Sequence, residues 1–462
     1  MKNRLWTALI LTSVTALYGC TSTAAEDSVT EEITETAEAE ETTAEETAET
    51  SLITSSYLTE EDIEINQTIE NSEDGGHALE ADGETVSMSN ALITKTGESS
   101  GDEADFYGEN AAVYAHDEAT LDLSNLIIKT NGTHANAVFS YGSGTTVNIE
   151  DSYIYTEGNC SGGLMTTGGG TMNASGLTVH TTGNSSAAIR SDRGGGTVNV
   201  NGGSYTTEGK GSPVIYSTAD ITVSDALLTS TSAQGVVVEG SNSVTLNNCE
   251  LNASNVSKNS DKSDYYQAVM IYQSMSGDAA EGLASFKMNG GTLTNTNGDI
   301  FFVNNTTAEI TLNNAEIINE SDGVFLRAAA AGWGSEGNNG GQVTMYASAQ
   351  EINGDLLADE VSSLNLYLSE GSLLNGAINP DGEAGEVYVE IDDDSVWTLS
   401  ADSYITSLSC DADAIDLNGY TLYINSVAYT EGTASEGSAI EVTVTSGTNH
   451  GNMPGGEPPA KP

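Results

Sequence analysis

The sequence predicts an all-β fold, a single-stranded parallel β-helix (solenoid) of about twelve coils. Three observations support this prediction: a recurring Asn, Asp or Gly position, apolar residues at fixed distances from it, and a nearly constant repeat length. The recurring position holds Asn90, Asn125, Asp151, Gly176, Gly202, Asp225, Asn248, Gly290 and Asn314. Because Asn, Asp and Gly tolerate a positive φ, this position predicts a backbone bend once per coil.

Apolar residues flank each bend at fixed spacings. The first lies four positions before the bend, at Val86, Leu121, Val147, Met172, Val198, Ile221, Val244, Phe286 and Ile310. A second follows two residues later, at Met88, Leu123, Ile149, Ala174, Val200, Val223, Leu246, Met288 and Leu312. A third lies seven residues after the first, at Ile93, Ile128, Ile154, Val179, Tyr205, Leu228, Leu251, Leu293 and Ile317. Side chains two residues apart share one face of a strand, so all three positions are predicted to point inward across the bend.

Two further positions recur after the third apolar residue. Small or hydroxyl-bearing residues lie nine positions after the first apolar residue, for example Thr130, Thr156, Thr181, Thr207 and Ser230. We expect them to face inward and to stack along the ladder, each satisfying the next. Glycines two positions later, at Gly97, Gly132, Gly158, Gly183 and Gly209, predict a second corner, after which a further apolar strand begins.

The repeat length distinguishes this fold from other repeat proteins. Successive first apolar residues are 35, 26, 25, 26, 23, 23, 42 and 24 residues apart. The Leu-x-x-Leu-x-Leu pattern of leucine-rich repeats is missing, and so are the apolar spacings of three and four that helical repeats need. Degenerate coils are predicted to start near residues 342, 363 and 386, and the last strands to close the open end.

The N-terminal element is predicted to be a targeting segment. Residues 1–19 combine Lys2 and Arg4 with an apolar run too short to span a membrane, which is typical of a signal peptide. This segment ends at Gly19-Cys20 and resembles a bacterial lipobox, which predicts lipidation of Cys20; an ordinary cleaved signal is the alternative. We therefore expect a lipid-anchored, extracytoplasmic protein of the bacterial cell envelope, exposed at the surface and attached to the membrane through the lipid only.

Three segments follow the predicted signal peptide. Residues 20–56 form an acidic, low-complexity stretch that predicts a disordered, extended tether. Residues 57–446 are assigned to the parallel β-helix with its degenerate C-terminal coils and cap. Residues 447–462 form a Gly/Pro-rich tail, which we also expect to be disordered.

The net charge restricts the possible partners. The chain carries a formal charge of −56, which argues against nucleic acid and against polyanionic glycans as partners. We interpret the acidity as a source of solubility and of repulsion between copies at a cell surface. No cofactor is predicted, and calcium ligation is kept as an alternative.

A lyase would need a basic residue to remove a proton and carboxylates to hold calcium beside a uronate. The nearest match is Arg190, Asp192 and Arg193, with Lys210 at the next corner. Neighbouring coils show no clustered carboxylates in the matching columns, so an exposed turn is the favoured interpretation.

A hydrolase would need two or three converging carboxylates. The densest acidic groups are Asp392, Asp393, Asp394, Asp411, Asp413 and Asp416. They lie in the degenerate C-terminal coils, where solvated turns explain them better than a catalytic or calcium site does. The five histidines are isolated along the chain and predict neither a zinc site nor a catalytic dyad.

Insertions between coils are the predicted recognition elements, because loops that project from a rigid solenoid are where such proteins place binding residues. Three insertions are expected near residues 98–110, 254–285 and 328–341. The candidate ligand-binding residues in them are Phe106, Tyr107, Tyr265, Tyr266, Tyr272 and Trp333. Their rings can stack on sugars or fold back to cap the coil, and both alternatives are kept.

The repeated Thr-Val-x-Val-x-Asn/Gly pattern, as in residues 197–202, resembles the adhesin-like β-helix lipoproteins of bacterial surfaces, which share the pectate-lyase-like superfold. The resemblance covers roughly residues 80–430 and implies a right-handed parallel β-helix. It carries over no catalytic set. The function that it favours is a non-catalytic, surface-displayed adhesin or carbohydrate-binding protein, whose partner is a surface glycan or a protein of a host or neighbouring cell. A glycan-degrading lyase or hydrolase is the alternative.

Overall fold

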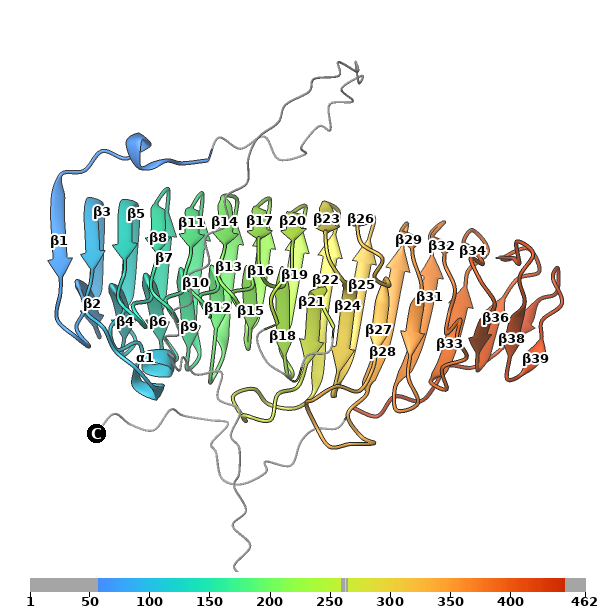
Figure 1. The fold of residues 1–462 in the computed structure, drawn as a ribbon. Coiled ribbons are helices and arrows are strands. Elements are labelled where there is room, and N and C mark those ends of the chain that lie inside the picture. The colour runs from blue at the N-terminus through green and yellow to red at the C-terminus, as the bar shows by residue number, and fades with distance from the viewer. Residues whose placement is uncertain (1–56, 259–261, 263–264, 445–462) are drawn as a thin grey trace, which may run out of the picture.

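The computed structural model describes residues 57–258, 262 and 265–444. In this part of the chain nearly all regular structure is β, and strands from successive repeats stack side by side along one axis (Figure 1). Most of the pairings are parallel, within a 22-stranded and an 11-stranded sheet. The all-β prediction and its parallel repeats are confirmed. The predicted signal peptide, Cys20 with the tether, and the whole tail (447–462) lie outside the described residues.

The strands fall into four sheets. The 22-stranded sheet contains β1 (Gln67–Asn71), β3 (Thr85–Lys95), β5 (Thr120–Thr130), β7 (Thr146–Glu150), β8 (Tyr153–Thr156), β10 (Gly170–Ser175), β11 (Thr178–Thr181), β13 (Gly196–Asn201), β14 (Ser204–Thr207), β16 (Asp220–Ser224), β17 (Leu227–Ser230), β19 (Ser243–Asn247), β20 (Glu250–Ala253), β22 (Leu283–Asn289), β23 (Thr292–Asn295), β25 (Thr306–Asn313), β26 (Glu316–Asn319), β28 (Gly341–Ser348), β31 (Ser363–Ser369), β33 (Glu386–Ile391), β36 (Ser407–Cys410) and β40 (Ser435–Glu436). The 11-stranded sheet contains β2 (Leu79–Asp82), β4 (Val113–His116), β6 (Val138–Tyr141), β9 (Leu164–Thr167), β12 (Ile189–Ser191), β15 (Ile215–Ser217), β18 (Val236–Glu239), β21 (Gln267–Tyr272), β24 (Asp299–Asn304), β27 (Leu326–Ala328) and β30 (Leu356–Ala358).

The remaining elements are short. The two smaller sheets are β29 (Glu351–Asn353), β32 (Leu373–Asn375), β34 (Val396–Thr398) and β37 (Ile415–Asp416), and β35 (Ser403–Ile405), β38 (Leu422–Ile424) and β39 (Val427–Ala428). The helices are the 3-10 helix η1 (Glu60–Asp62) and α1 (Asp102–Tyr107). The antiparallel pairs β36–β40 and β38–β39 occur at the C-terminal end, as expected of terminal strands that close a stack. Among the described residues, no helix has the length and apolar character needed to span a membrane.

The bend column is confirmed at every predicted position. All nine residues have a positive φ, between 46° at Asp151 and 69° at Gly202. The apolar columns pair in register as well: Val198 lies opposite Ile221, and Ile221 lies opposite Val244. These side chains belong to one continuous buried core that runs along the stack.

The hydroxyl column faces inward as predicted, but its hydrogen bonding differs from the prediction. Thr156 donates to the carbonyl of Ser161 at 2.6 Å, and Thr207 donates to that of Ser212 at 2.6 Å. These hydroxyls, like those of Thr181 and Ser230, are therefore satisfied within their own coil and not by the next threonine, whereas the hydroxyl of Thr130 has no partner among the described residues. The physical reason is that the chain reverses at the second corner and brings a carbonyl of the same coil within reach.

The second corner also differs in detail from the prediction. At Gly158 and Gly183 a Cβ would collide with the backbone carbonyl of the equivalent glycine one coil earlier. Glycine is needed there for close approach between coils. The positive φ falls two residues later, at Cys160 (55°) and Ser185 (54°).

Candidate functional site

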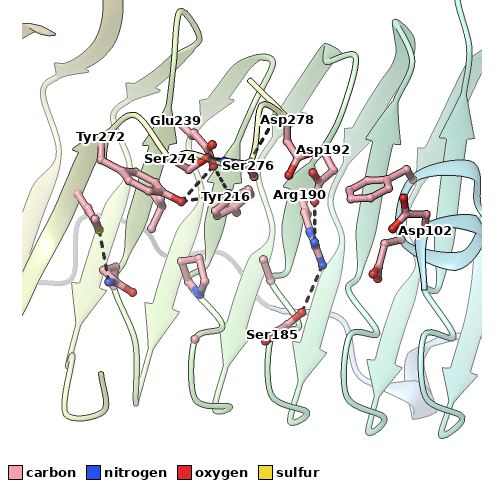
Figure 2. A pocket seen from close by; sticks show the side chains of 18 residues that line it. Asp102, Ser185, Arg190, Asp192, Tyr216, Glu239, Tyr272, Ser274, Ser276 and Asp278 are labelled. Atoms are coloured by element: carbon pink, nitrogen blue, oxygen red, sulfur yellow. Dashed lines mark hydrogen bonds and ion pairs between the residues drawn. The ribbon is translucent and has the colours of Figure 1, made fainter. Parts of the chain in front are cut away.

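The outer face of the 11-stranded sheet carries a cleft. Its floor comes from side chains on β12, β15, β18 and β21, and α1 and residues 274–278 flank it (Figure 2). The empty space, including the part open to solvent, is about 900 Å³. The parallel register produces this floor, because Arg190 pairs with Tyr216, Tyr216 with Val237, and Val237 with Met270. Two residues further along the chain lie Asp192, just after β12, Glu239 at the end of β18 and Tyr272 at the end of β21.

Arg190 and Asp192 form an ion pair at one side of the floor. The Nη2 atom of Arg190 lies 2.6 Å from Oδ2 of Asp192, and both side chains are almost buried. Asp192 Oδ1 also accepts a hydrogen bond from the backbone N–H of Arg193 at 3.0 Å. Burial raises the pKa of Asp192, and the Arg190 guanidinium opposes this effect.

Glu239 lies at the other side of the floor, at the end of β18, and is 1% exposed. Its Oε2 accepts hydrogen bonds from the hydroxyl groups of Tyr216 and Tyr272, the latter at 3.0 Å. Its Oε1 is buried and has no hydrogen-bond partner among the described residues. Burial raises the pKa of Glu239 to about 7, although the nearby hydroxyls of Ser274 and the two tyrosines favour the carboxylate.

Arg193 joins the two flanks of the cleft. Its guanidinium lies 2.7 Å from Asp278 and 3.5 Å from Asp102 on α1. The same group lies over the ring of Phe106, 3.9 Å from its centre. Since Asp102 and Asp278 come from different insertions, Arg193 holds together segments that are far apart in the sequence.

Two further contacts hold the helix α1 in place. The buried Asp105 Oδ1 lies 2.8 Å from Nδ1 of the buried His134. The hydroxyl of Thr167 donates to the carbonyl of Phe106 at 2.7 Å. A helix of six residues has little stability of its own, so these contacts and the packing of Phe106 position it.

The cleft corrects the prediction that Arg190 and Arg193 lack carboxylate partners from neighbouring coils. Asp278 and Asp102 pair with Arg193, and Glu239 lies in the same cleft. Nothing in the sequence indicated Glu239. The residues that pair with Arg190 along the sheet are Tyr216 and then Val237, and Glu239 lies two residues after Val237, at the end of an apolar strand. Lys210, the other suggested basic residue, does not line the cleft.

The six predicted ligand-binding aromatic residues occupy different places. Phe106 and Tyr272 line the cleft. Trp333 is 1% exposed and packs edge-on against Tyr272, so it has folded back onto the sheet. Tyr265 packs on Phe302 beneath Arg327, and Tyr266 lies beside Lys258. Tyr107 packs against Tyr141. Sequence reasoning missed Tyr216, because its position in the middle of a strand of 3 residues gave only a weak signal.

Other groups with possible chemistry lie elsewhere. Asp392 accepts backbone hydrogen bonds from Glu370 and Asp394, as in a solvated turn. The histidines are less isolated than predicted, since Asp82, His116 and Asp117 cluster at the surface. A second cluster brings Cys160 to the His134–Asp105 pair. The first cluster does not line the cleft, whereas Asp105 of the second cluster does and also supports α1.

Comparison of the chain with protein-family models, with curated proteins and with solved structures gave no match.

Proposed function

We propose that this protein is a lipid-anchored, surface-displayed carbohydrate-binding solenoid, and that the sugar binds in the cleft over β12, β15, β18 and β21. The solenoid is proposed to be a right-handed β-helix of about twelve coils, as the repeat length and strand stacking favour. A surface glycan is the proposed partner, with a protein of another cell as the alternative partner of an adhesin.

The observation that carries the proposal is the composition of the cleft floor. The half-buried ring of Tyr216 and the side chains of Val237 and Met270 supply apolar surface. Buried charged groups and hydroxyls surround this surface, and Oε1 of Glu239 has a free hydrogen-bonding valence. Apolar patches beside a few convergent polar groups suit sugars, whose rings have apolar faces and hydroxyl edges.

Hydrolysis of a glycan is a second candidate, because one observation favours it. Glu239 and Asp192 face the same cleft from β18 and from the end of β12, with only β15 between them. Two strand spacings correspond to roughly 9 to 10 Å between their backbones. A protonated Glu239 could protonate a glycosidic oxygen while Asp192 activates water, as in inverting enzymes. A uronate lyase is less compatible with the cleft, because its carboxylates would repel the substrate.

A glycan-array screen of the full-length protein, with and without calcium, tests the proposed function. Tyr216→Ala should weaken binding of any captured glycan by about fivefold or more, since a ring contact is worth about 1 kcal/mol in addition to the apolar area it buries. Tyr216→Phe keeps the ring and should lose less of the affinity for the glycan. The matched control is Tyr346→Ala, because this tyrosine is 40% exposed on the other large sheet.

Unchanged binding by Tyr216→Ala would contradict the placement of the sugar. New reducing ends released from a captured glycan would favour hydrolysis, provided that Glu239→Gln abolishes them.

A further inference from the structure

Most carboxylates that line the cleft form an ion pair, but one does not. Arg190 pairs with Asp192, Arg193 with Asp278, and His134 supports Asp105. Of the carboxylates that line the cleft, Glu239 is the one for which the described residues show no ion pair. The other carboxylates of the cleft therefore have an arginine or histidine partner, and the most buried carboxylate, Glu239, has none among the described residues.

The surroundings of Glu239 leave one oxygen available. Both tyrosine hydroxyls contact Oε2, while Oε1 is buried without a hydrogen-bond partner in the described part of the chain. A buried carboxylate with an unused oxygen is costly unless a donor or a cation approaches it. Figure 2 shows Glu239, Tyr216 and Tyr272 side by side at one end of the cleft, with Ser274 next to them.

Aromatic rings beside Glu239 suit a cation. On this face of the protein, Arg190 lies 5.9 Å from the ring centre of Tyr216, and Arg327 lies 4.3 Å from that of Tyr265. The rings of Tyr216 and Tyr265 therefore already lie next to a guanidinium group, as expected from the partial negative charge on the faces of aromatic rings. A ligand ammonium near Tyr216 and Tyr272 could reach Glu239 and gain from both interactions.

We propose that the cleft selects amino sugars with a free, protonated amine, and that Glu239 Oε1 receives this amine. The inference rests on the proposed carbohydrate binding and names the sugar class within it. N-Acetylated sugars have the same ring but no charge, so they gain only the ring and hydroxyl contacts. Uronates are disfavoured by the same carboxylate.

The titration of Glu239 agrees with this geometry. Burial raises its pKa to about 7, and the negative charge of Asp192 adds to this effect. The groups that face it are Ser274, Tyr216, Tyr272 and the more distant Asp192, and none of them carries positive charge. A bound ammonium should favour the ionised carboxylate and release a proton near neutral pH.

Oligomers of glucosamine and of N-acetylglucosamine, matched in length, test the inference with the full-length protein at pH 7. Wild type should bind the glucosamine oligomer at least tenfold more tightly, with proton release seen by calorimetry in buffers of different ionisation enthalpy. Glu239→Gln should remove the preference and the proton release. The isosteric amide preserves the fold, which a thermal melt verifies.

Glu208→Gln is the control for general attraction by the acidic surface. Glu208 is exposed, pairs with His180 and lies outside the cleft, so the preference should persist. Equal affinities in wild type, or a preference that survives Glu239→Gln, would overturn the inference while leaving carbohydrate binding intact. Failure of every glycan on the array to bind would instead overturn the proposed function.

Discussion

At the residue scale, Glu239 gives a pH dependence of stability. Its pKa rises from 4.5 to about 7 on folding. A raised pKa means that its contribution to stability is fully present below about pH 4.5 and is lost as pH rises through about 7. At about 1.4 kcal/mol per pH unit, the full loss is about 3 kcal/mol.

The measurement is a series of thermal melts of wild type and Glu239→Gln from pH 4 to 8.5. Wild type should match the variant near pH 4 and become progressively less stable than it above about pH 5. The comparison with the variant cancels the general repulsion within a chain of charge −56, which also increases with pH. Curves that stay parallel over the whole range would show that Glu239 does not titrate as described.

The contrast between Asn248 and Glu239 shows what the sequence could predict at this scale. Asn248 lies at a positive φ of 49°, as its column indicated, because backbone geometry restricts the residue type at every coil. The importance of Glu239 depends on burial and on side chains from β15 and β21. Those contacts are specific to one place on the solenoid, so no repeat reveals them.

At the scale of elements, the two flanks of the cleft depend on Arg193. Its guanidinium is half-exposed and bridges Asp102 on α1 to Asp278. Partly exposed ion pairs contribute roughly 1 kcal/mol or less, which corresponds to about fivefold in a local opening equilibrium. Arg193→Ala should therefore accelerate amide hydrogen exchange in residues 102–107 and 273–282 by up to fivefold, with the sheet core unchanged.

Lys210→Ala is the matched control for that experiment, because it removes an exposed cation from the adjacent corner without touching the cleft. If exchange in both flanks is the same in Arg193→Ala and wild type, Arg193 does not hold them together. Hydrogen exchange that increases throughout the sheets would indicate general destabilisation instead.

The insertions were predictable as elements, whereas their contacts were not. Irregular repeat intervals located the extra residues, and the structure places α1 and residues 274–278 beside the cleft. The way in which each insertion folds back onto the sheet determines whether an aromatic ring lines the cleft or is covered by other residues. Trp333 is covered because it supports Tyr272, and nothing in the spacing of residues distinguished these two roles.

At the scale of the whole molecule, the proposed binding cleft and the proposed anchor belong to different parts of the chain. The cleft lies among coils of the solenoid's middle, and Cys20 precedes the described residues. The chain between them is strongly acidic and should be repelled by anionic lipid headgroups. Membrane attachment would then depend on acyl chains, each buried methylene contributing about 0.8 kcal/mol.

Cys20→Ser should consequently release the protein from the membrane fraction, because a serine cannot take the thioether-linked lipid. Fractionation with and without detergent measures this, and mass spectrometry of the mature N-terminus identifies the acylated residue. Cys249→Ser is the control, since this buried thiol lies in the core and should not alter localisation. Retention of Cys20→Ser in the membrane until detergent is added would contradict a lipid anchor at Cys20, and cleavage at another position would favour an ordinary secreted protein.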